Sequence, residues 1–412
     1  MNLENQPHQC LNKAPKLVAI YFPQLHPIPE NSAWWGEGFT DWDNVKTAQP
    51  LFHGHYQPRT PLAKNYYDQS RLDVIRSQVE MAKRYGLYGF CHYHYWFDGK
   101  QLLETPTNLM LQNRDIDFPF CLSWANETWS RRWDGRDHQI LIQQTHPPEK
   151  ERWQLHFNYL IKAWEDERAI RVDGKPVFVI YRPQNIPAVG QMLDFWREQA
   201  VKRGLKGLYF MVQKQAEFHP RDYLCHFDGV FQFQPTESVH SPEFDNPHLQ
   251  KSIWRRRIGR RLPHSTKEAI HKLELKLKYR KATHTLYDYN DTWENIARVR
   301  REPEITTYPG AFVDWDNTPR YKQRAIIFEG ACPENFAAGL RNLVQSMPER
   351  QLPEDLIFIN AWNEWAEGAY LEPDERHGYG YLEAIKAVLD ESTPAQSAGP
   401  DQQCLAKQRN VP

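Results

Sequence analysis

The sequence predicts an α/β fold, a (β/α)₈ TIM-type barrel with a long, basic, helical insertion between strands six and seven. Short apolar, β-rich runs recur eight times along the 412 residues, and helix-forming segments separate most of them. Strands that alternate with helices form βαβ units and a parallel sheet, and about eight such units close into a barrel. The rival is a doubly wound open sheet. It would carry a glycine-rich phosphate loop after its first strand, where Pro23-Gln24-Leu25-His26-Pro27 stands instead.

The predicted elements follow from apolar runs and from helical periodicity. In chain order, the predicted strands are Leu17–Phe22, Leu87–Tyr93, Phe118–Trp124, Pro176–Tyr181, Gly207–Val212, Gly229–Phe233, Gly310–Trp315 and Leu356–Trp362. The predicted helices between them are Arg71–Tyr85, Lys150–Glu167, Val189–Arg203, Trp293–Arg301 and Pro333–Met347.

The barrel domain is predicted to span residues 16–390. A polar N-terminal extension, residues 1–15, precedes it, and residues 391–412 form a polar tail that we expect to be disordered. The helical insertion covers residues 234–307 and carries a basic block between residues 251 and 281. That block is either a solvated helical surface or a patch that contacts an anionic membrane or a lipid-linked glycan.

Composition excludes several classes of function. The net charge is −1, so no overall field attracts nucleic acid. The six cysteines contain no CxxC pair, and Cys91 and Cys121 lie in apolar runs, so neither a disulfide framework nor a zinc site is predicted. The start of the sequence lacks a basic, apolar leader, and no run of 18 apolar residues occurs, so a cytoplasmic location is expected. Aromatic residues make up 13% of the chain, which is usual for carbohydrate-active proteins.

Two carboxylates, Glu364 and Glu367, follow the eighth predicted strand and stand beside Trp362, Trp365 and Tyr370. Sugar-cleaving sites combine acids that move protons at the glycosidic oxygen with aromatic rings that stack on sugar faces. We therefore predict that the two glutamates are the catalytic pair. The alternative is a pair of solvated surface acids next to core tryptophans.

Side chains that follow the other strands are expected to converge on the same barrel mouth. Rings and hydrogen-bonding groups dominate there, as a site for a polyhydroxylated ligand requires. The predicted substrate-binding residues are Tyr21, His26, Trp34, Trp35, Glu37, His92, Tyr93, His94, Trp96, Trp124, Asn126, Glu127, Trp133, Tyr181, Asp314, Asp316, Asn317, Arg320, Trp362 and Asn363. No metal is predicted, because His92 and His94 lack a third ligand, and no cofactor is expected.

Four strings of residues carry a resemblance to a known family. They are Tyr21-Phe22-Pro23-Gln24-Leu25-His26, Trp124-Ala125-Asn126-Glu127, Trp315-Asp316-Asn317-Thr318-Pro319-Arg320 and Trp362-Asn363-Glu364-Trp365-Ala366-Glu367-Gly368. In this order they resemble the glycoside hydrolase family 99-like (WbsX-type) proteins, from about Lys16 to about Val388. The resemblance implies a bacterial protein associated with surface-polysaccharide genes. True family 99 enzymes are retaining endo-acting α-mannosidases or mannanases on a (β/α)₈ barrel, and their paired glutamates would match Glu364 and Glu367.

The last string departs from the motif of the true hydrolases, which reads Asn-Glu-Trp-His-Glu-Gly-Thr-Gln. Here Ala366 replaces the histidine, and Ala369-Tyr370 replace the Thr-Gln pair. The glutamates are kept, but the side chains that would shape the sugar subsites are not. Retaining chemistry is therefore implied, whereas mannose as the substrate is not.

The leading hypothesis is a glycoside hydrolase-like enzyme that acts on an α-linked sugar of a bacterial surface polysaccharide or its precursor. Glu367 would be the general acid/base. Glu127 would orient the substrate or support the site, and a role as a catalytic acid is the alternative for it. The resemblance implies that Glu364 deprotonates the sugar 2-OH to give a 1,2-anhydro intermediate; a direct glutamyl nucleophile stays open. One alternative is a glycosyltransferase or transglycosylase of O-antigen or surface-polysaccharide biosynthesis, with Asp314, Asp316 and Arg320 at a diphosphate. Another is a glycan-binding module without catalysis.

Overall fold

Nine parallel strand segments form the wall of a barrel. The computed structural model describes residues 14–131, 136–215, 223–241, 244, 284–299 and 301–392. Within this part of the chain, the strand order is β12-β10-β9-β8-β4-β2-β1-β15-β13. The strands are β1 (Lys16–Tyr21), β2 (Gly89–Phe97), β4 (Phe120–Trp124), β8 (Lys175–Ile180), β9 (Tyr209–Lys214), β10 (Gly229–Gln232), β12 (Thr306–Tyr308), β13 (Gly310–Phe312) and β15 (Leu356–Asn360).

One chain segment joins the two ends of this sheet. β12 pairs with β10, placing Tyr308 opposite Phe231, whereas β13 pairs with β15. Only Pro309, which has no N–H to donate, separates β12 from β13, so the two act as halves of one strand; β13 matches the start of the predicted seventh strand, Gly310–Trp315, and β12 lies before it. Gly310 allows the close approach here, because a Cβ at this position would clash with the carbonyl oxygen of Gln232. The barrel of eight strands is thereby nearly closed.

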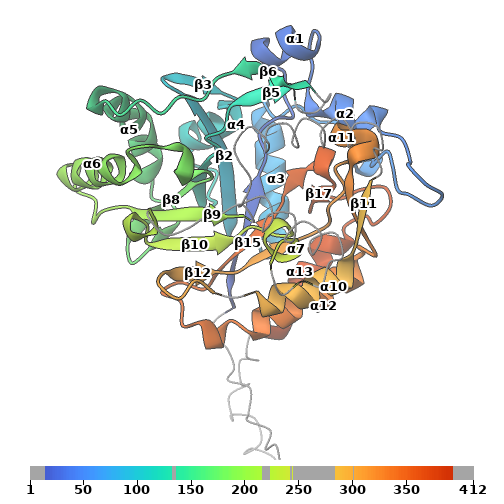
Figure 1. Ribbon diagram of the computed structural model, residues 1–412. Helices are drawn as coiled ribbons and strands as arrows, with labels where there is room; N and C mark the ends of the chain where they lie inside the picture. Colours follow the sequence, from blue (N-terminus) through green and yellow to red (C-terminus); the bar gives the residue numbers. More distant parts are fainter. Residues whose placement is uncertain are drawn as a thin grey trace, which may run out of the picture.

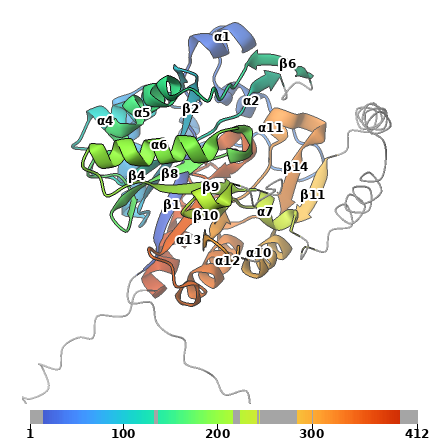
Figure 2. The same cartoon turned by 60° about the vertical axis from the view of Figure 1, so that its left-hand side comes forward.

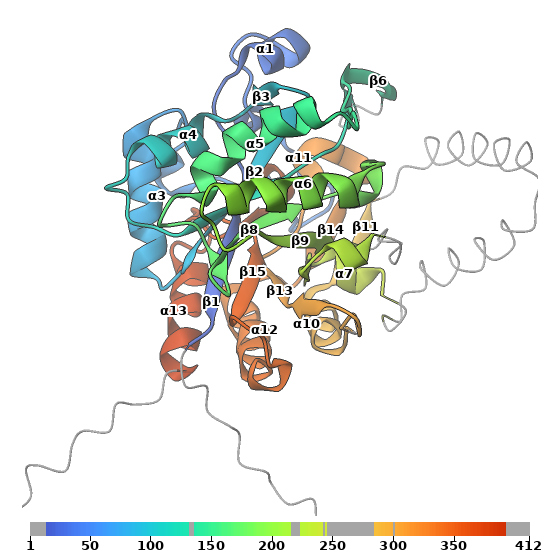
Figure 3. The same cartoon turned by 90° about the vertical axis from the view of Figure 1, so that its left-hand side faces the viewer.

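Helices surround the barrel wall in all three views (Figures 1, 2 and 3). The α-helices are α1 (Pro29–Trp35), α2 (Asp41–Thr47), α3 (Leu72–Arg84), α4 (Thr105–Gln112), α5 (Lys150–Trp164), α6 (Val189–Lys202), α7 (Thr236–Val239), α10 (Tyr289–Arg298), α11 (Thr318–Tyr321), α12 (Pro333–Gln345) and α13 (Gly380–Ser392). Trp196 of α6, for example, packs against Phe178 of β8 and Phe210 of β9. Across the described ranges, none of these helices combines the length and apolar character that a bilayer crossing requires.

Smaller strands extend the connections between the main elements. They are β3 (Lys100–Leu102), β5 (Trp129–Arg131), β6 (Arg136–Ile142), β7 (Arg171–Val172), β11 (Thr285–Asp288), β14 (Ile326–Glu329), β16 (Asn363–Glu364) and β17 (Ala369–Tyr370). In Figure 1, α1, β3, β5 and β6 gather at the top of the molecule. Each follows the carboxyl end of a parallel strand, so this end is the barrel mouth.

Each barrel strand is buried on both faces. Val18 and Ile20 of β1 belong to the cluster inside the barrel, together with Phe358 of β15. Leu17 and Ala19 belong to the cluster between the wall and the helices. Alternate residues of one strand therefore enter different cores, although the whole run is apolar, as is typical of parallel sheets.

The eight predicted strands and five predicted helices are confirmed, with ends that shift by a few residues. Cys91 and Cys121 are buried, as predicted, and they lie opposite each other on β2 and β4. At the C-terminus, α13 continues to Ser392, so residues 391 and 392 are helical rather than part of the predicted tail. Residues 393–412 and the basic block at 251–281 lie outside the described residues.

Candidate active site

The loop after β15 carries both predicted catalytic glutamates. Glu364 ends the short strand β16, and Glu367 lies in the helical turn that follows. The side chain of Asn363 accepts a hydrogen bond from the Phe22 N–H at 2.8 Å and donates one to the Phe22 carbonyl at 2.9 Å. Gly368 then turns the chain with φ of 67°, a conformation that favours glycine. These contacts fix the glutamate loop against the carboxyl end of β1.

Arg320 joins three carboxylates in a buried cluster. Its Nη1 lies 3.1 Å from Glu364 Oε1 and 2.8 Å from Glu367 Oε1. Its Nη2 donates to Oδ2 of Asp41, on α2, at 2.5 Å. Because both glutamate oxygens contact the same nitrogen, they are separated by at most the sum of the two distances, 5.9 Å. The two glutamates therefore face one point.

This carboxylate cluster favours the uptake of a proton. Burial raises the pKa of Glu364, and the adjacent charge of Glu367 raises it further, while Arg320 opposes both effects. Burial also raises the pKa of Glu367 against the pull of Arg320. One guanidinium cannot balance three ionised carboxylates, so a proton shared by the glutamate pair lowers the energy of the cluster. The pair can thus supply an acid and a base side by side.

Three tyrosines border the glutamates inside the barrel. Burial and then the charge of Glu364 raise the pKa of Tyr93 and of Tyr95, which keeps both phenols protonated. Burial first, then Glu127, and more weakly Glu367 raise the pKa of Tyr181, which places its hydroxyl within the field of both acids. Tyr95 is absent from the predicted set. Tyr95 lies two residues after Tyr93 on β2, so the two rings face the same side of the strand, and this spacing is the signal in the sequence that could have identified Tyr95.

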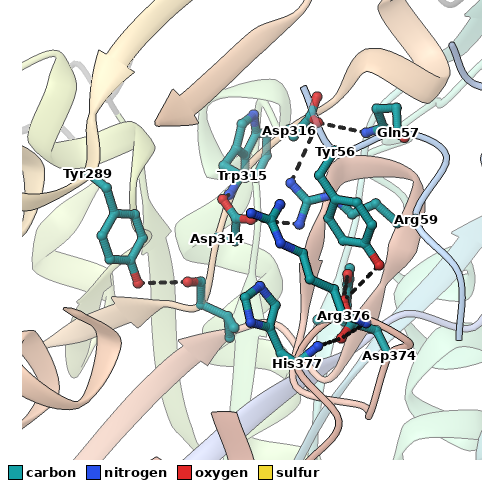
Figure 4. Close-up of polar contacts among 12 residues, drawn as sticks. Tyr56, Gln57, Arg59, Tyr289, Asp314, Trp315, Asp316, Asp374, Arg376 and His377 are labelled. Atoms are coloured by element: carbon teal, nitrogen blue, oxygen red, sulfur yellow. Dashed lines mark hydrogen bonds and ion pairs between the residues drawn. The ribbon is translucent and has the colours of Figure 1, made fainter. Parts of the chain in front are cut away.

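A second network, centred on Arg59, braces the glutamate loop (Figure 4). Arg59 donates to Oδ2 of Asp314 at 2.6 Å, and its second nitrogen lies 3.5 Å from Oδ2 of Asp316. That same Asp316 oxygen lies 2.8 Å from His55 and 2.6 Å from Gln57. The N–H of Asp316 donates to the carbonyl of Glu367 at 2.7 Å. Asp314 and Asp316 therefore hold the loop after β13 against the loop that carries Glu367.

Other predicted residues brace the mouth through backbone contacts. Asn126 accepts a hydrogen bond from the N–H of Arg182 and donates to its carbonyl, both at 2.8 Å. Asn317 accepts from the N–H of Ile326 at 2.7 Å. Glu127 pairs with the Arg182 side chain at 2.9 Å and remains partly exposed near Tyr181.

The residues that follow β1 lie above or beside the mouth. Trp34 packs edge-on against Trp129, with ring centroids 5.9 Å apart, and the Arg131 guanidinium lies 4.8 Å from the centre of the Trp35 ring. Glu37 is exposed. His26 is buried, with neither ring nitrogen hydrogen-bonded in the described structure. Trp133 lies outside the described residues.

Six predicted side chains lie on the outer face of the wall instead. They belong to the cluster packed between strands and helices or contact its members: Tyr21, His92, His94, Trp96, Trp124 and Trp362. Trp124 is 4% exposed and meets His156 of α5 and Trp196 of α6. Because neighbouring residues on a strand point to opposite faces, the five of these rings that lie on β1, β2 and β4 are directed away from the barrel interior; Trp362, after β15, packs against Phe90 in the same outer cluster. They pack the barrel against its helices and are not part of the site proposed below.

Comparison with known proteins identifies the family. Residues 17–385 match the family model described as glycosyltransferase WbsX. The chain belongs to the WbsX family. Two proteins of Xanthomonas campestris pv. campestris, each described as uncharacterized protein WxcX, are 37% identical over 384 and 379 residues. Each alignment covers 90% of this chain and 49% of the relative, so the chain spans about half the length of the curated relatives it matches.

Solved structures with similar folds include glycoside hydrolases. One, described as a glycoside hydrolase-like protein, superposes with a TM-score of 0.56 at 14% identity, over 93% of this chain and 97% of that one. The family 99 endo-α-mannosidase from Bacteroides thetaiotaomicron superposes with a TM-score of 0.52 at 13% identity, over 91% and 97%. At these identities the similarity establishes a common barrel fold but not a common reaction.

Proposed function

We propose that this protein is a glycoside hydrolase-like enzyme that cleaves an α-linked sugar of a bacterial surface polysaccharide or its precursor, with retention of configuration. The observation that carries the proposal is the contact of one Arg320 nitrogen with both Glu364 and Glu367. It brings two carboxyl groups with raised pKa values to the mouth of a barrel of the kind that glycosidases use. Their nearest contact oxygens are at most 5.9 Å apart, which is closer to the spacing of retaining enzymes than of inverting ones.

We assign the general acid/base role to Glu367, which is the more exposed of the two, with 14% of its side chain accessible against 8% for Glu364. A group that protonates a leaving oxygen needs access to the outer part of the mouth. In the acid step, the Glu367 proton passes to the glycosidic oxygen as the C1–O bond breaks.

Glu364 acts at the sugar ring as that bond breaks. In family 99 chemistry it takes the proton of the 2-OH, and the freed oxygen attacks C1 to close a 1,2-anhydro ring. Attack of the Glu364 carboxylate itself on C1 is the simpler route. Both routes invert C1 once, and water inverts it a second time, so both predict net retention.

The family's description as glycosyltransferase makes sugar transfer the second candidate. A nucleotide-sugar enzyme needs free groups for the diphosphate or its metal. Asp314 and Asp316, the acidic pair predicted for that task, already accept hydrogen bonds from Arg59, His55 or Gln57. Arg320 is likewise engaged by three carboxylates. These contacts favour hydrolysis or transglycosylation over transfer from a nucleotide sugar.

Matched substrates with poor and good leaving groups test the proposal. We would compare an α-linked oligosaccharide from a bacterial surface polysaccharide with the matching α-glycosyl fluoride, because fluoride leaves without protonation. Glu367→Gln should lower oligosaccharide cleavage by about 10²–10⁴-fold and largely spare the fluoride. Glu364→Gln should stop both reactions, and Glu80→Gln, at an exposed position of α3, should change neither. Equal loss of both reactions in Glu367→Gln would reject its role as the acid.

The cellular setting is part of the same proposal. A cytoplasmic location would give the enzyme access to lipid-linked precursors, and the basic segment at 251–281 would contact their phosphates or the anionic membrane. Cell fractionation with and without that segment tests this: loss of membrane association on its removal supports the contact, and an unchanged distribution rejects it.

A further inference from the structure

A cavity opens beside helix α3, on the outside of the barrel. Its volume is about 550 Å³, and it lies between the loop at Pro61–Asp68, helix α3 and the turn from Trp365 to Pro373. Neither Glu364, Glu367 nor Arg320 lines it. Its size falls within the usual range of small-molecule sites. The proposed reaction does not use this cavity.

Aromatic rings in this outer cavity are held in fixed positions. Tyr66 packs edge-on against Trp42, with centroids 5.1 Å apart, and Lys46 lies 4.5 Å from the centre of the same ring. The Tyr67 hydroxyl donates to Glu372 at 2.6 Å, and Trp365 Nε1 donates to the same oxygen at 2.7 Å. Rings that are already ordered lose little entropy when a ligand binds, so the cavity is preorganised.

Polar groups without a protein partner share the cavity with these rings. The side-chain amide of Asn65 and the hydroxyls of Tyr66 and Ser77 make no hydrogen bond to another part of the described structure. By contrast, Gln78 and Glu372 at the cavity wall are bonded to each other at 2.7 Å. The charged lining residues Arg71 and Asp73 pair with each other at 2.7 Å, and Asp68 accepts a hydrogen bond from the Ser70 N–H. The cavity thus combines a rigid wall with neutral donors and acceptors that remain available to a ligand.

We propose that this outer cavity is a second carbohydrate-binding site, which holds a neutral oligosaccharide segment on residues other than Glu364, Glu367 and Arg320. Aromatic rings beside free amide and hydroxyl groups match the alternating apolar faces and hydroxyls of sugar rings. The choice of a glycan as ligand rests on the proposed function, since a polysaccharide enzyme gains affinity by holding its substrate at a second point. Binding here needs neither catalytic glutamate.

Fluorine NMR of protein labelled with 5-fluorotryptophan tests the proposal with α-mannotriose and maltotriose as probes. Trp34 lies beside the mouth and reports on binding there, whereas Trp365 lines the outer cavity but also stands between Glu364 and Glu367, so its shift is assigned with blocking variants. The Glu364→Gln/Glu367→Gln double variant is used throughout to prevent cleavage. We expect a saturable shift of the Trp365 signal with at least one probe in the millimolar range.

Blocking variants decide where a shift originates. Ser77→Trp places a large ring in the cavity from an exposed position of α3 and should weaken binding at least tenfold. Glu80→Trp, on the same helix but outside the cavity lining, is the matched control and should stay within twofold. Tyr66→Ser is a second variant, also expected to weaken binding. No saturable Trp365 shift with either probe, or a shift that Ser77→Trp leaves intact, overturns the proposal. A cleavage assay that fails while the Trp365 shift persists instead counts against the proposed reaction alone.

Discussion

Replacement of Arg320 by Met should destabilise the protein strongly at neutral pH. The side chain of Arg320 is 5% exposed and is the cation shared by Asp41, Glu364 and Glu367. Removing one partner of a buried ion pair costs about 3–5 kcal/mol, because the remaining charges stay buried without compensation. With three carboxylates left behind, we expect a loss in the free energy of unfolding of about 3–5 kcal/mol at pH 7.5.

The destabilisation caused by Arg320→Met should be smaller at lower pH. Without the guanidinium, burial and mutual repulsion raise the carboxyl pKa values further above those of the unfolded chain. Between the unfolded and the raised folded pKa values, the folded variant binds more protons, so its stability falls as pH rises and recovers as pH falls. The difference between wild type and variant should therefore be smaller at pH 5 than at pH 7.5.

Urea unfolding followed by tryptophan fluorescence at both pH values measures this difference. Arg71→Met is the matched control, because the Arg71–Asp73 pair is exposed on both sides and its loss should leave stability unchanged. A deficit for Arg320→Met below about 1 kcal/mol, or one that is independent of pH, would refute the account of the cluster.

Three further perturbations test neighbouring parts of the structure. Gly368→Ala should lower the free energy of unfolding by about 1–3 kcal/mol, since its Cβ would lie 2.9 Å from the Asp316 nitrogen at a φ of 67°. Urea titration measures this loss, and an unchanged urea midpoint would contradict the prediction. Trp124→Ala should lower the free energy of unfolding by about 3–5 kcal/mol in the same assay, because the ring packs against α5 and α6. Sugar binding to correctly folded protein should be kept. Weakened binding with full stability would contradict the packing role of Trp124. Burial raises the pKa of Glu372 to about 7, so its contribution to stability is present below pH 4.5 and is lost as pH rises through 7. The free energy of unfolding of Glu372→Gln should therefore rise relative to that of wild type by up to about 3 kcal/mol between pH 5 and pH 8. A pH-independent difference between the two proteins argues against this.

The barrel was predictable from the sequence because each strand is a short apolar run between helical segments. What those runs do not encode is which residues face inward. Both faces of a barrel strand are buried here, so the polar–apolar alternation that marks a half-exposed strand is missing. Tyr95 and Trp124 illustrate the consequence: the tyrosine borders Glu364 and was not predicted, whereas the tryptophan was predicted and faces the helices.

The ion-pair partners were also beyond the reach of sequence patterns. Glu364 and Glu367 were predicted from their local string, but Asp41 lies 279 positions from Arg320, with which it pairs. The local signal at Asp41 is a capping box formed by Thr40 and Asp43, which predicts only that a helix starts there. Arg59 is a comparable case, since its contacts with Asp314 and Asp316 depend on how distant loops meet.

The anomeric configuration of the first product tests the central claim most directly. Proton NMR of an α-linked oligosaccharide from a bacterial surface polysaccharide, or of the matching α-glycosyl fluoride, is recorded during cleavage and before mutarotation, and it reports the configuration at the newly formed reducing end. Because both glutamates of the Arg320 cluster would act on one sugar ring, the α-anomer should appear first with wild-type protein. It should not form from the oligosaccharide with Glu367→Gln. The β-anomer as first product, or α-product formed from the oligosaccharide at an unchanged rate by Glu367→Gln, would contradict the proposed roles of the two glutamates.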